Sequence, residues 1–170
     1  VVRATDGGGL WHEATSTVAV LDVNERPTLY GAWYEVEENS PEGTRVGAPL
    51  VATDPDFGQV LLFDITGGDA GDVFRVGACS GQIEVAEAVL DYETRIHYRL
   101  VVTVEDNGVP RLSHSAVVNI TLLDVNEPPV MQDVTHAVEE NSAVGTAVGA
   151  RIVATDPDFG QVLLFDITGG

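Results

Sequence analysis

One stretch of 18 residues occurs twice in the chain without a single difference between the copies. The stretch VATDPDFGQVLLFDITGG runs from Val51 to Gly68 and again from Val153 to Gly170, 102 residues later. Two shorter motifs keep this offset, VEENS at residues 36–40 and 138–142 and LDVNE at residues 21–25 and 123–127. A period of this length is too long for a solenoid repeat and suits a small domain. The sequence therefore predicts tandem domains.

The domain boundaries follow from the diverged stretches between the repeated motifs. Residues 26–35 and 128–137 share almost nothing, yet the acidic motifs around them persist. Prolines follow both LDVNE motifs, where a fixed φ angle would stiffen the entry to the next domain. We expect residues 1–25 to be the C-terminal part of one repeat, residues 26–127 a complete repeat, and residues 128–170 the N-terminal part of a third. The first joint is then residues 21–27, and the second joint is residues 123–129.

Apolar and polar residues alternate within the complete repeat, which is typical of strands with one buried face. The alternation predicts strands at residues 61–65, 98–105 and 118–122, with shorter strands at 74–76 and 83–85 and others before Glu38 and after Gly43. Turn residues separate the strands, for example at residues 67–71, and no long stretch has helical periodicity. We expect an all-β fold, a Greek-key immunoglobulin-like sandwich of about seven strands repeated in tandem.

The charge of the chain limits the kinds of molecule that it can bind. Its formal net charge is −19, from 27 acidic and eight basic residues, and such a field repels nucleic acid and anionic lipid but attracts cations. We therefore expect no nucleic-acid partner. The single cysteine, Cys79, excludes an intrachain disulfide and a cysteine-rich metal site, and we expect it to be at least half-buried. No apolar run reaches 18 residues, so we expect membrane attachment only through parts of a longer parent protein.

Oxygen-bearing side chains are concentrated in the loops that tandem sandwiches would bring to each joint. Carboxylates and amides are the ligands that calcium prefers; magnesium suits them less well, and zinc is disfavoured by the ligand type. The sequence therefore predicts a calcium site at each joint. The candidate set at the second joint has six carboxylates and two amides: Glu38, Asn39, Asp91, Glu93, Asn126, Glu127, Asp156 and Asp158.

Five motifs in fixed order resemble the cadherin family, in which extracellular repeats bind calcium between domains. A single acidic turn such as Asp54-Pro55-Asp56 would be weak evidence, because Asp and Gly are common in solvated turns. The five together, recurring at domain spacing, are specific. They are Glu38-Asn39, Asp54 with Asp56, residues 90–93 (LDYE), Asp106-Asn107-Gly108, and residues 124–127 (DVNE).

The resemblance implies three calcium ions at the second joint. It assigns no firm role to Asp124. The implied ligands of the first two ions are Glu38, Asp91, Glu93, Glu127, Asp158 and the backbone carbonyl of Val125. The implied ligands of the third ion are Asn126, Asp156 and Asp158, and the backbone carbonyl of Pro128 is a further implied ligand at this joint.

At the first joint, the resemblance implies ligands from the complete repeat and from the LDVNE motif. Glu25 and Glu127 stand where the family has Asp, which keeps the charge and changes the reach. Arg26 and Pro128 replace a final Asn that contributes only its backbone carbonyl, so this contribution should survive. The implied ligands of the first joint are Asn24, Glu25, the carbonyl of Arg26, Asp54, Asp56 and Asp106.

The function implied by the resemblance is a calcium-rigidified rod in a cell-adhesion protein. We expect a homophilic or heterophilic protein partner and a location on the outer face of the plasma membrane, or secretion. An alternative is a spacer or carbohydrate-binding module of a secreted or surface protein. A hydrolase is disfavoured because no catalytic sequence motif stands out, so no enzyme activity is expected. Packing is the expected role of Trp11 and Trp33.

Overall fold

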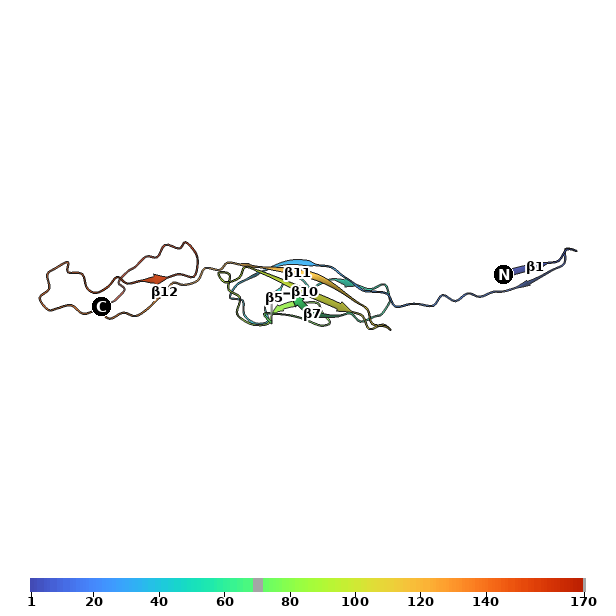
Figure 1. The fold of residues 1–170 in the computed structure, drawn as a ribbon, viewed down its shortest axis with the longest axis horizontal. Coiled ribbons are helices and arrows are strands. Elements are labelled where there is room, and N and C mark those ends of the chain that lie inside the picture. Colours follow the sequence, from blue (N-terminus) through green and yellow to red (C-terminus); the bar gives the residue numbers. More distant parts are fainter. Residues whose placement is uncertain (69–71, 170) are drawn as a thin grey trace.

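The computed structural model describes residues 1–68 and 72–169, which form thirteen strands and no helix. One sandwich occupies the middle of the chain, with a hairpin extending from one end and the C-terminal segment from the other (Figure 1). The first seven strands are β1 (Val2–Thr5), β2 (Trp11–Ala14), β3 (Thr28–Leu29), β4 (Ala32–Glu37), β5 (Arg45–Val46), β6 (Ala52–Thr53) and β7 (Leu62–Gly68). The others are β8 (Phe74–Val76), β9 (Ile83–Val85), β10 (His97–Glu105), β11 (Ser113–Leu123), β12 (Val130–Met131) and β13 (Ala154–Thr155).

The central sandwich is built from strands β3 to β11. One sheet has the order β4-β11-β10-β7, in which β4 runs parallel to β11 and the other pairs are antiparallel. The second layer contains the order β5-β9-β8 and the short pair β3-β6. The prediction of an all-β sandwich is confirmed, and β8 and β9 have the predicted bounds. The predicted turn at residues 67–71 extends beyond the described residues.

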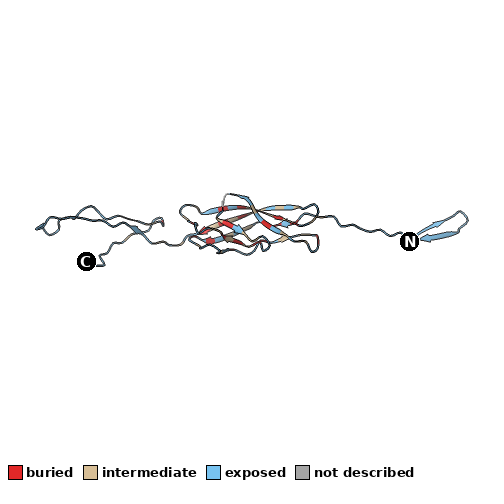
Figure 2. Ribbon diagram, turned by 90° about the horizontal axis from the view of Figure 1, so that it is seen from below, coloured by how far each residue is buried: buried red, intermediate tan, exposed pale blue. Residues whose placement is uncertain are grey.

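The hydrophobic core lies inside the central sandwich (Figure 2). Its buried residues come from the part of the sequence that begins at Leu29 and ends at Leu122. Alternate residues of β10 and β11 point into it, and Leu100 is directly opposite Val118 in the register. Phe74 and Tyr98 meet edge to face, with ring centroids 5.2 Å apart. The period-two alternation is therefore the physical basis of the sandwich, since each strand buries one face.

Leu100→Ala should strongly destabilise the sandwich, because Leu100 is fully buried at the centre of β10. Truncating a buried leucine removes contacts and leaves a cavity, at a cost of about 2–5 kcal/mol in the free energy of unfolding. Denaturant titration followed by circular dichroism measures this loss. Leu62→Ala is the matched control, since Leu62 is 39% exposed. Equal losses in both variants would contradict the assigned core.

Two expectations about single residues are wrong. Trp33 does not pack in the core but is 80% exposed, because its position in β4 faces away from the second layer. Cys79 is also exposed, in the turn before β9. Trp11 is exposed in the hairpin and stacks against Arg3, whose guanidinium carbon lies 4.2 Å from the ring centroid.

The segments that flank the sandwich form only local strand pairs. β1 and β2 form a hairpin in which Val2 pairs with Ala14, and all its residues are exposed. In the C-terminal segment, β12 pairs with β13, so that Val130 is opposite Thr155. This repeats the pairing of β3 with β6, in which Thr28 is opposite Thr53. Within the described residues, no segment forms a helix that could cross a lipid bilayer.

Candidate metal centre

Glu38 is the most buried acidic side chain on the sandwich side of the second joint, at 3% exposure. It follows β4, immediately before Asn39, whose φ of 56° is unusual for a residue other than glycine. Its Oε2 accepts a hydrogen bond from the Tyr92 backbone N–H at 2.8 Å, and its Oε1 accepts one from the Val125 N–H, also at 2.8 Å. One carboxylate thus fixes three segments: the end of β4, the loop before β10, and the chain after β11.

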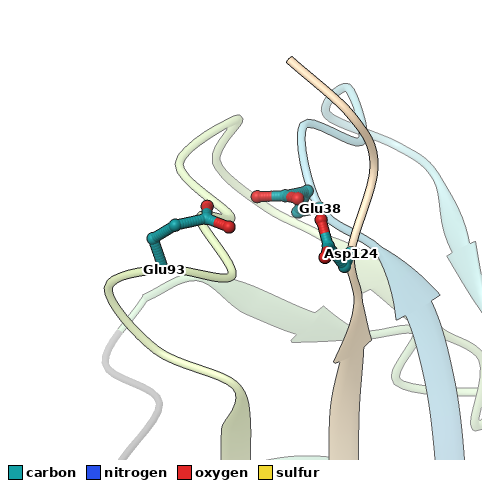
Figure 3. Close-up of side chains that lie close together, drawn as sticks. All are labelled: Glu38, Glu93 and Asp124. Carbon is teal, nitrogen blue, oxygen red and sulfur yellow. The ribbon is translucent and has the colours of Figure 1, made fainter. Parts of the chain in front are cut away.

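Three carboxylates converge beside this anchor. One oxygen each from Glu38, Glu93 and Asp124 lies within 4.8 Å of the others (Figure 3). A backbone hydrogen bond lowers the pKa of Glu93, but loss of solvent contact and the charges of Glu38, Asp124 and Glu127 outweigh it and raise that pKa. Loss of solvent contact, followed by the charges of Asp158 and Glu38, also raises the pKa of Asp124. The cluster therefore carries negative charge that a cation would compensate.

The structure changes the roles expected for two residues near this cluster. Asp124, which had no firm role from the sequence, belongs to the group of three. Asp91 is not in that group, because its carboxylate accepts hydrogen bonds from the Thr94 backbone N–H at 2.7 Å and from the Thr94 hydroxyl at 2.9 Å. A sequence signal for Asp124 was present, since Asp22 stands at the same place in the first joint.

On the other side of the second joint, Asp158 is buried with one carboxylate oxygen unpaired. Its Oδ2 accepts the Glu127 N–H at 2.8 Å, and its own N–H donates to Asp156 Oδ1 at 3.0 Å. Its Oδ1 has no hydrogen-bond partner among the described residues. A buried carboxylate oxygen without a donor is costly unless something else compensates it, and a hard cation would do so. The residues present therefore fit calcium.

Two amide contacts complete the second joint. The Asn39 side-chain amide donates to Glu127 Oε1 at 2.8 Å, which connects the loop after β4 to the LDVNE motif. Gln161 donates to Asn126 Oδ1 at 2.9 Å. Pro128, which was considered only for its carbonyl, lies exposed after these residues.

The first joint repeats the same network. Asp56 Oδ2 accepts the Glu25 N–H at 2.8 Å, and Asp54 Oδ1 accepts the Asp56 N–H at 2.8 Å. Asp54 Oδ2 is buried and has no hydrogen-bond partner among the described residues. Gln59 donates to Asn24 Oδ1 at 2.5 Å and to Asp56 Oδ2 at 2.9 Å. Sequence reasoning missed Gln59 and Gln161, although both lie in the exactly repeated stretch.

Asp106 holds the first joint from the end of β10 and is only 1% exposed. It accepts hydrogen bonds from the Asn24 amide at 3.1 Å and from the backbone N–H groups of Gly108 and Leu112 at 3.0 Å each. Burial opposes its ionisation, but these donors, together with the charge of Arg111, lower its pKa. Asp106 is therefore ready to act as an anionic ligand. The Arg26 side chain is exposed at this joint.

Gly108→Ala should disrupt the first joint, because a Cβ at this position would overlap the Asn24 side-chain amide. We expect Asn24 to be displaced from Asp106 and calcium binding at this joint to weaken by about tenfold or more, which is ~1.4 kcal/mol. Calorimetric titration with calcium measures the change. Gly67→Ala is the control, since its Cβ would make only ordinary contact with Val101 at 3.8 Å. Unchanged affinity in Gly108→Ala would contradict a role for Asn24.

The geometry at both joints can be compared with known proteins. A model of the cadherin domain matches residues 33–123, more than half of the chain. This chain belongs to the cadherin family. It is 35% identical over 94% of its length to Protocadherin Fat 2 of Rattus norvegicus, and 38% identical over 93% of its length to Cadherin-1 of Gallus gallus. These matches cover 4% and 19% of the two proteins, respectively.

Solved cadherin structures agree with the fold. The structure of Protocadherin Gamma B2 extracellular cadherin domains 3-6 matches with a TM-score of 0.64 and 25% identity, covering 90% of this chain and 40% of that one. The chain is thus an extracellular cadherin repeat module with the β-sandwich fold of adhesion proteins.

Proposed function

We propose that this chain is a segment of a calcium-rigidified rod in a cell-adhesion protein. Residues 1–25, 26–127 and 128–170 are parts of three successive cadherin repeats, and calcium binds at the two joints between them. The observation that carries the proposal is that the DPD turn at each joint has one buried, unpaired carboxylate oxygen, Asp54 Oδ2 at the first joint and Asp158 Oδ1 at the second. One such costly group in each copy of the acidic turn indicates that both turns bind a cation.

At the second joint, ligands come from both sides of the LDVNE motif. The group Glu38, Glu93 and Asp124 supplies carboxylates from the complete repeat, and Asp156 and Asp158 supply them from the following one. Asp91 joins this set by releasing its hydrogen bonds to Thr94. The remaining ligands are the side chains of Asn126 and Glu127 and the carbonyls of Val125 and Pro128.

At the first joint, the equivalent ligands are Asn24, Glu25, the carbonyl of Arg26, Asp54, Asp56 and Asp106. Calcium fits both sets because it accepts six to eight oxygen ligands in flexible geometry, whereas magnesium requires a near-octahedral shell. Calcium neutralises carboxylates of two adjacent repeats at once, so its binding aligns them. The chain has a structural role of this kind and is not an enzyme.

The parent protein acts at the cell surface, where the rod presents an adhesion face to a protein partner, either another copy or a different protein. This chain contributes length and stiffness. Its attachment to the membrane is through other parts of the parent, because the acidic surface of this segment repels anionic lipid.

Calorimetric titration of the calcium-free chain tests the proposal. We expect saturable calcium binding that weakens as the pH is lowered, since protons compete with the cation for Glu93 and Asp124, whose pKa values are raised. Magnesium at the same concentrations should bind more weakly, because it dehydrates reluctantly. Absence of saturable calcium binding, or binding of magnesium with equal affinity, would refute the calcium assignment.

A further inference from the structure

Asn119, Ile120 and Thr121 form the sequence Asn-x-Ser/Thr, the acceptor of N-linked glycosylation in secreted proteins. The chain has six asparagines, and only Asn119 is followed two positions later by Ser or Thr without an intervening proline. The motif lies in β11, four residues before Leu123 at the start of the second joint. None of the calcium-related contacts involves it.

The register of β11 places the acceptor on the outer face of the sandwich. Val118 and Ile120 are fully buried, so the intervening Asn119 points away from the core and is half-exposed. Within the part of the chain that the structure describes, the side-chain amide of Asn119 makes no hydrogen bond. A glycan on its Nδ2 would therefore project into solvent without disturbing the core.

A groove beside Asn119 could receive the first sugar. The groove has a volume of about 290 Å³ and is lined by Trp33, His97 and Arg99, among others. Trp33 is directly across from Asn119 in the parallel pair β4-β11, and its indole is 80% exposed. The Thr121 hydroxyl, at the rim, lies 3.3 Å from His97 Nδ1. An aromatic face with polar groups around it suits a sugar ring, which has apolar C–H faces and polar edges.

The combination is specific to the complete repeat. Counting back 102 residues, the preceding repeat has Thr17-Val18-Ala19 in place of the acceptor motif. Counting forward by the same offset, the following repeat has Thr135 in place of Trp33. The exposed tryptophan and the acceptor asparagine are therefore not general features of these repeats, and they occur together on one face.

We propose that Asn119 is N-glycosylated and that the first N-acetylhexosamine of the glycan packs on Trp33. In the reaction, Asn119 Nδ2 attacks the anomeric carbon of an oligosaccharide carried by a polyprenyl diphosphate in the secretory pathway. A C–N bond forms, the bond from the anomeric carbon to the diphosphate oxygen breaks, and the lipid diphosphate leaves with the electron pair. The amide proton passes to a base of the transferase. The proposal depends on the extracellular location of the family and is independent of calcium.

The test is to produce the full chain, preceded by a cleavable secretion signal, in cultured animal cells and to identify glycopeptides by mass spectrometry. We expect a glycan at Asn119 that peptide N-glycosidase removes, leaving aspartate. Asn119→Gln and Thr121→Ala should lose it completely, whereas Thr121→Ser should keep it. Secreted and cell-retained chains are both analysed, so that a failure of secretion does not hide the result. Unmodified Asn119 in both fractions of the unsubstituted chain would overturn the proposal.

A second measurement tests the contact with Trp33. In the native glycoprotein, Trp33→Ala should increase the rate of glycan removal by peptide N-glycosidase severalfold, because the first sugar loses its packing surface. The two chains should be cleaved at equal rates after denaturation. Equal rates in the native state would overturn the proposed contact with Trp33. Glycosylation of Asn119 is tested separately, by mass spectrometry.

Discussion

Asp158→Ala should weaken calcium binding at the second joint by on the order of 100-fold, or about 2.7 kcal/mol. The substitution removes both the unpaired buried oxygen and the acceptor of the Glu127 N–H at 2.8 Å. Asp156→Ala should act in the same direction, because Asp156 Oδ1 holds the Asp158 N–H. Calorimetric titration of the variant chains with calcium measures both effects.

The sandwich itself should be unaffected by these two changes, because its core ends at Leu122 and neither aspartate belongs to it. Thermal unfolding of the complete repeat in chelator should therefore match the unsubstituted chain. Asp64→Ala is the matched control: it removes an exposed carboxylate from β7, away from both joints, and should leave calcium affinity unchanged. Cooperative unfolding of the complete repeat in Asp156→Ala or Asp158→Ala would contradict the assignment of these residues to the joint.

Removal of calcium should make the joints flexible. In a chain extended at both ends to whole repeats, X-ray scattering should give a long, stiff particle in calcium and a shorter average length in chelator. The physical reason is the convergence of Glu38, Glu93 and Asp124, whose negative charges repel when no cation lies among them. A rod of equal length and stiffness in both conditions would refute the mechanism.

Proteolysis gives the same prediction a second readout. Calcium at 100 times its dissociation constant should stabilise the bound joint by about 2.7 kcal/mol, so cleavage within residues 123–129 should slow by roughly 100-fold. Cleavage inside the sandwich should change little, because its core does not depend on the joints. The Leu100→Ala variant is the control for cleavage inside the sandwich. In this variant we expect faster cleavage there, both in calcium and in chelator.

The sequence was sufficient to predict the sandwich, because alternation with period two is a local property of each strand. β8 and β9 were predicted with their observed bounds, and the buried faces of β10 and β11 followed from the same pattern. The alternation could not tell which face of β4 lies against the second layer. Trp33 was expected to pack, although it faces solvent. The side of a strand that is buried depends on its partner.

The candidate site was predictable in composition but not in arrangement. Repetition of acidic motifs identified nearly all the residues at the joints, and the hydrogen bonds of Glu38, Asp56, Asp106 and Asp158 place these side chains there. Spacing could not show that Asp91 is engaged by Thr94 or that Asp124 approaches Glu38 and Glu93. Those facts depend on side-chain rotation within loops, which no periodicity encodes.

The two identical copies of the 18-residue stretch show which structural features depend on the local sequence and which depend on tertiary contacts. In both copies the second aspartate of the DPD motif donates its N–H to the first and accepts the N–H of the LDVNE glutamate. The strand pairs β3-β6 and β12-β13 also match in register. Yet Leu62–Gly68 forms β7, whereas the identical residues 164–169 form no strand, and exposure rises from 8% at Phe63 to 55% at Phe165.

The sequence alone thus determined the tandem repeat, the strand pattern and the acidic turns, because these depend on contacts between residues near in the chain or on the LDVNE motif beside them. Tertiary structure decided whether an apolar segment becomes a buried strand. β7 exists because β10 supplies its hydrogen-bond partners and the second layer covers its apolar face, and the described residues contain no counterpart of β10 for the second copy.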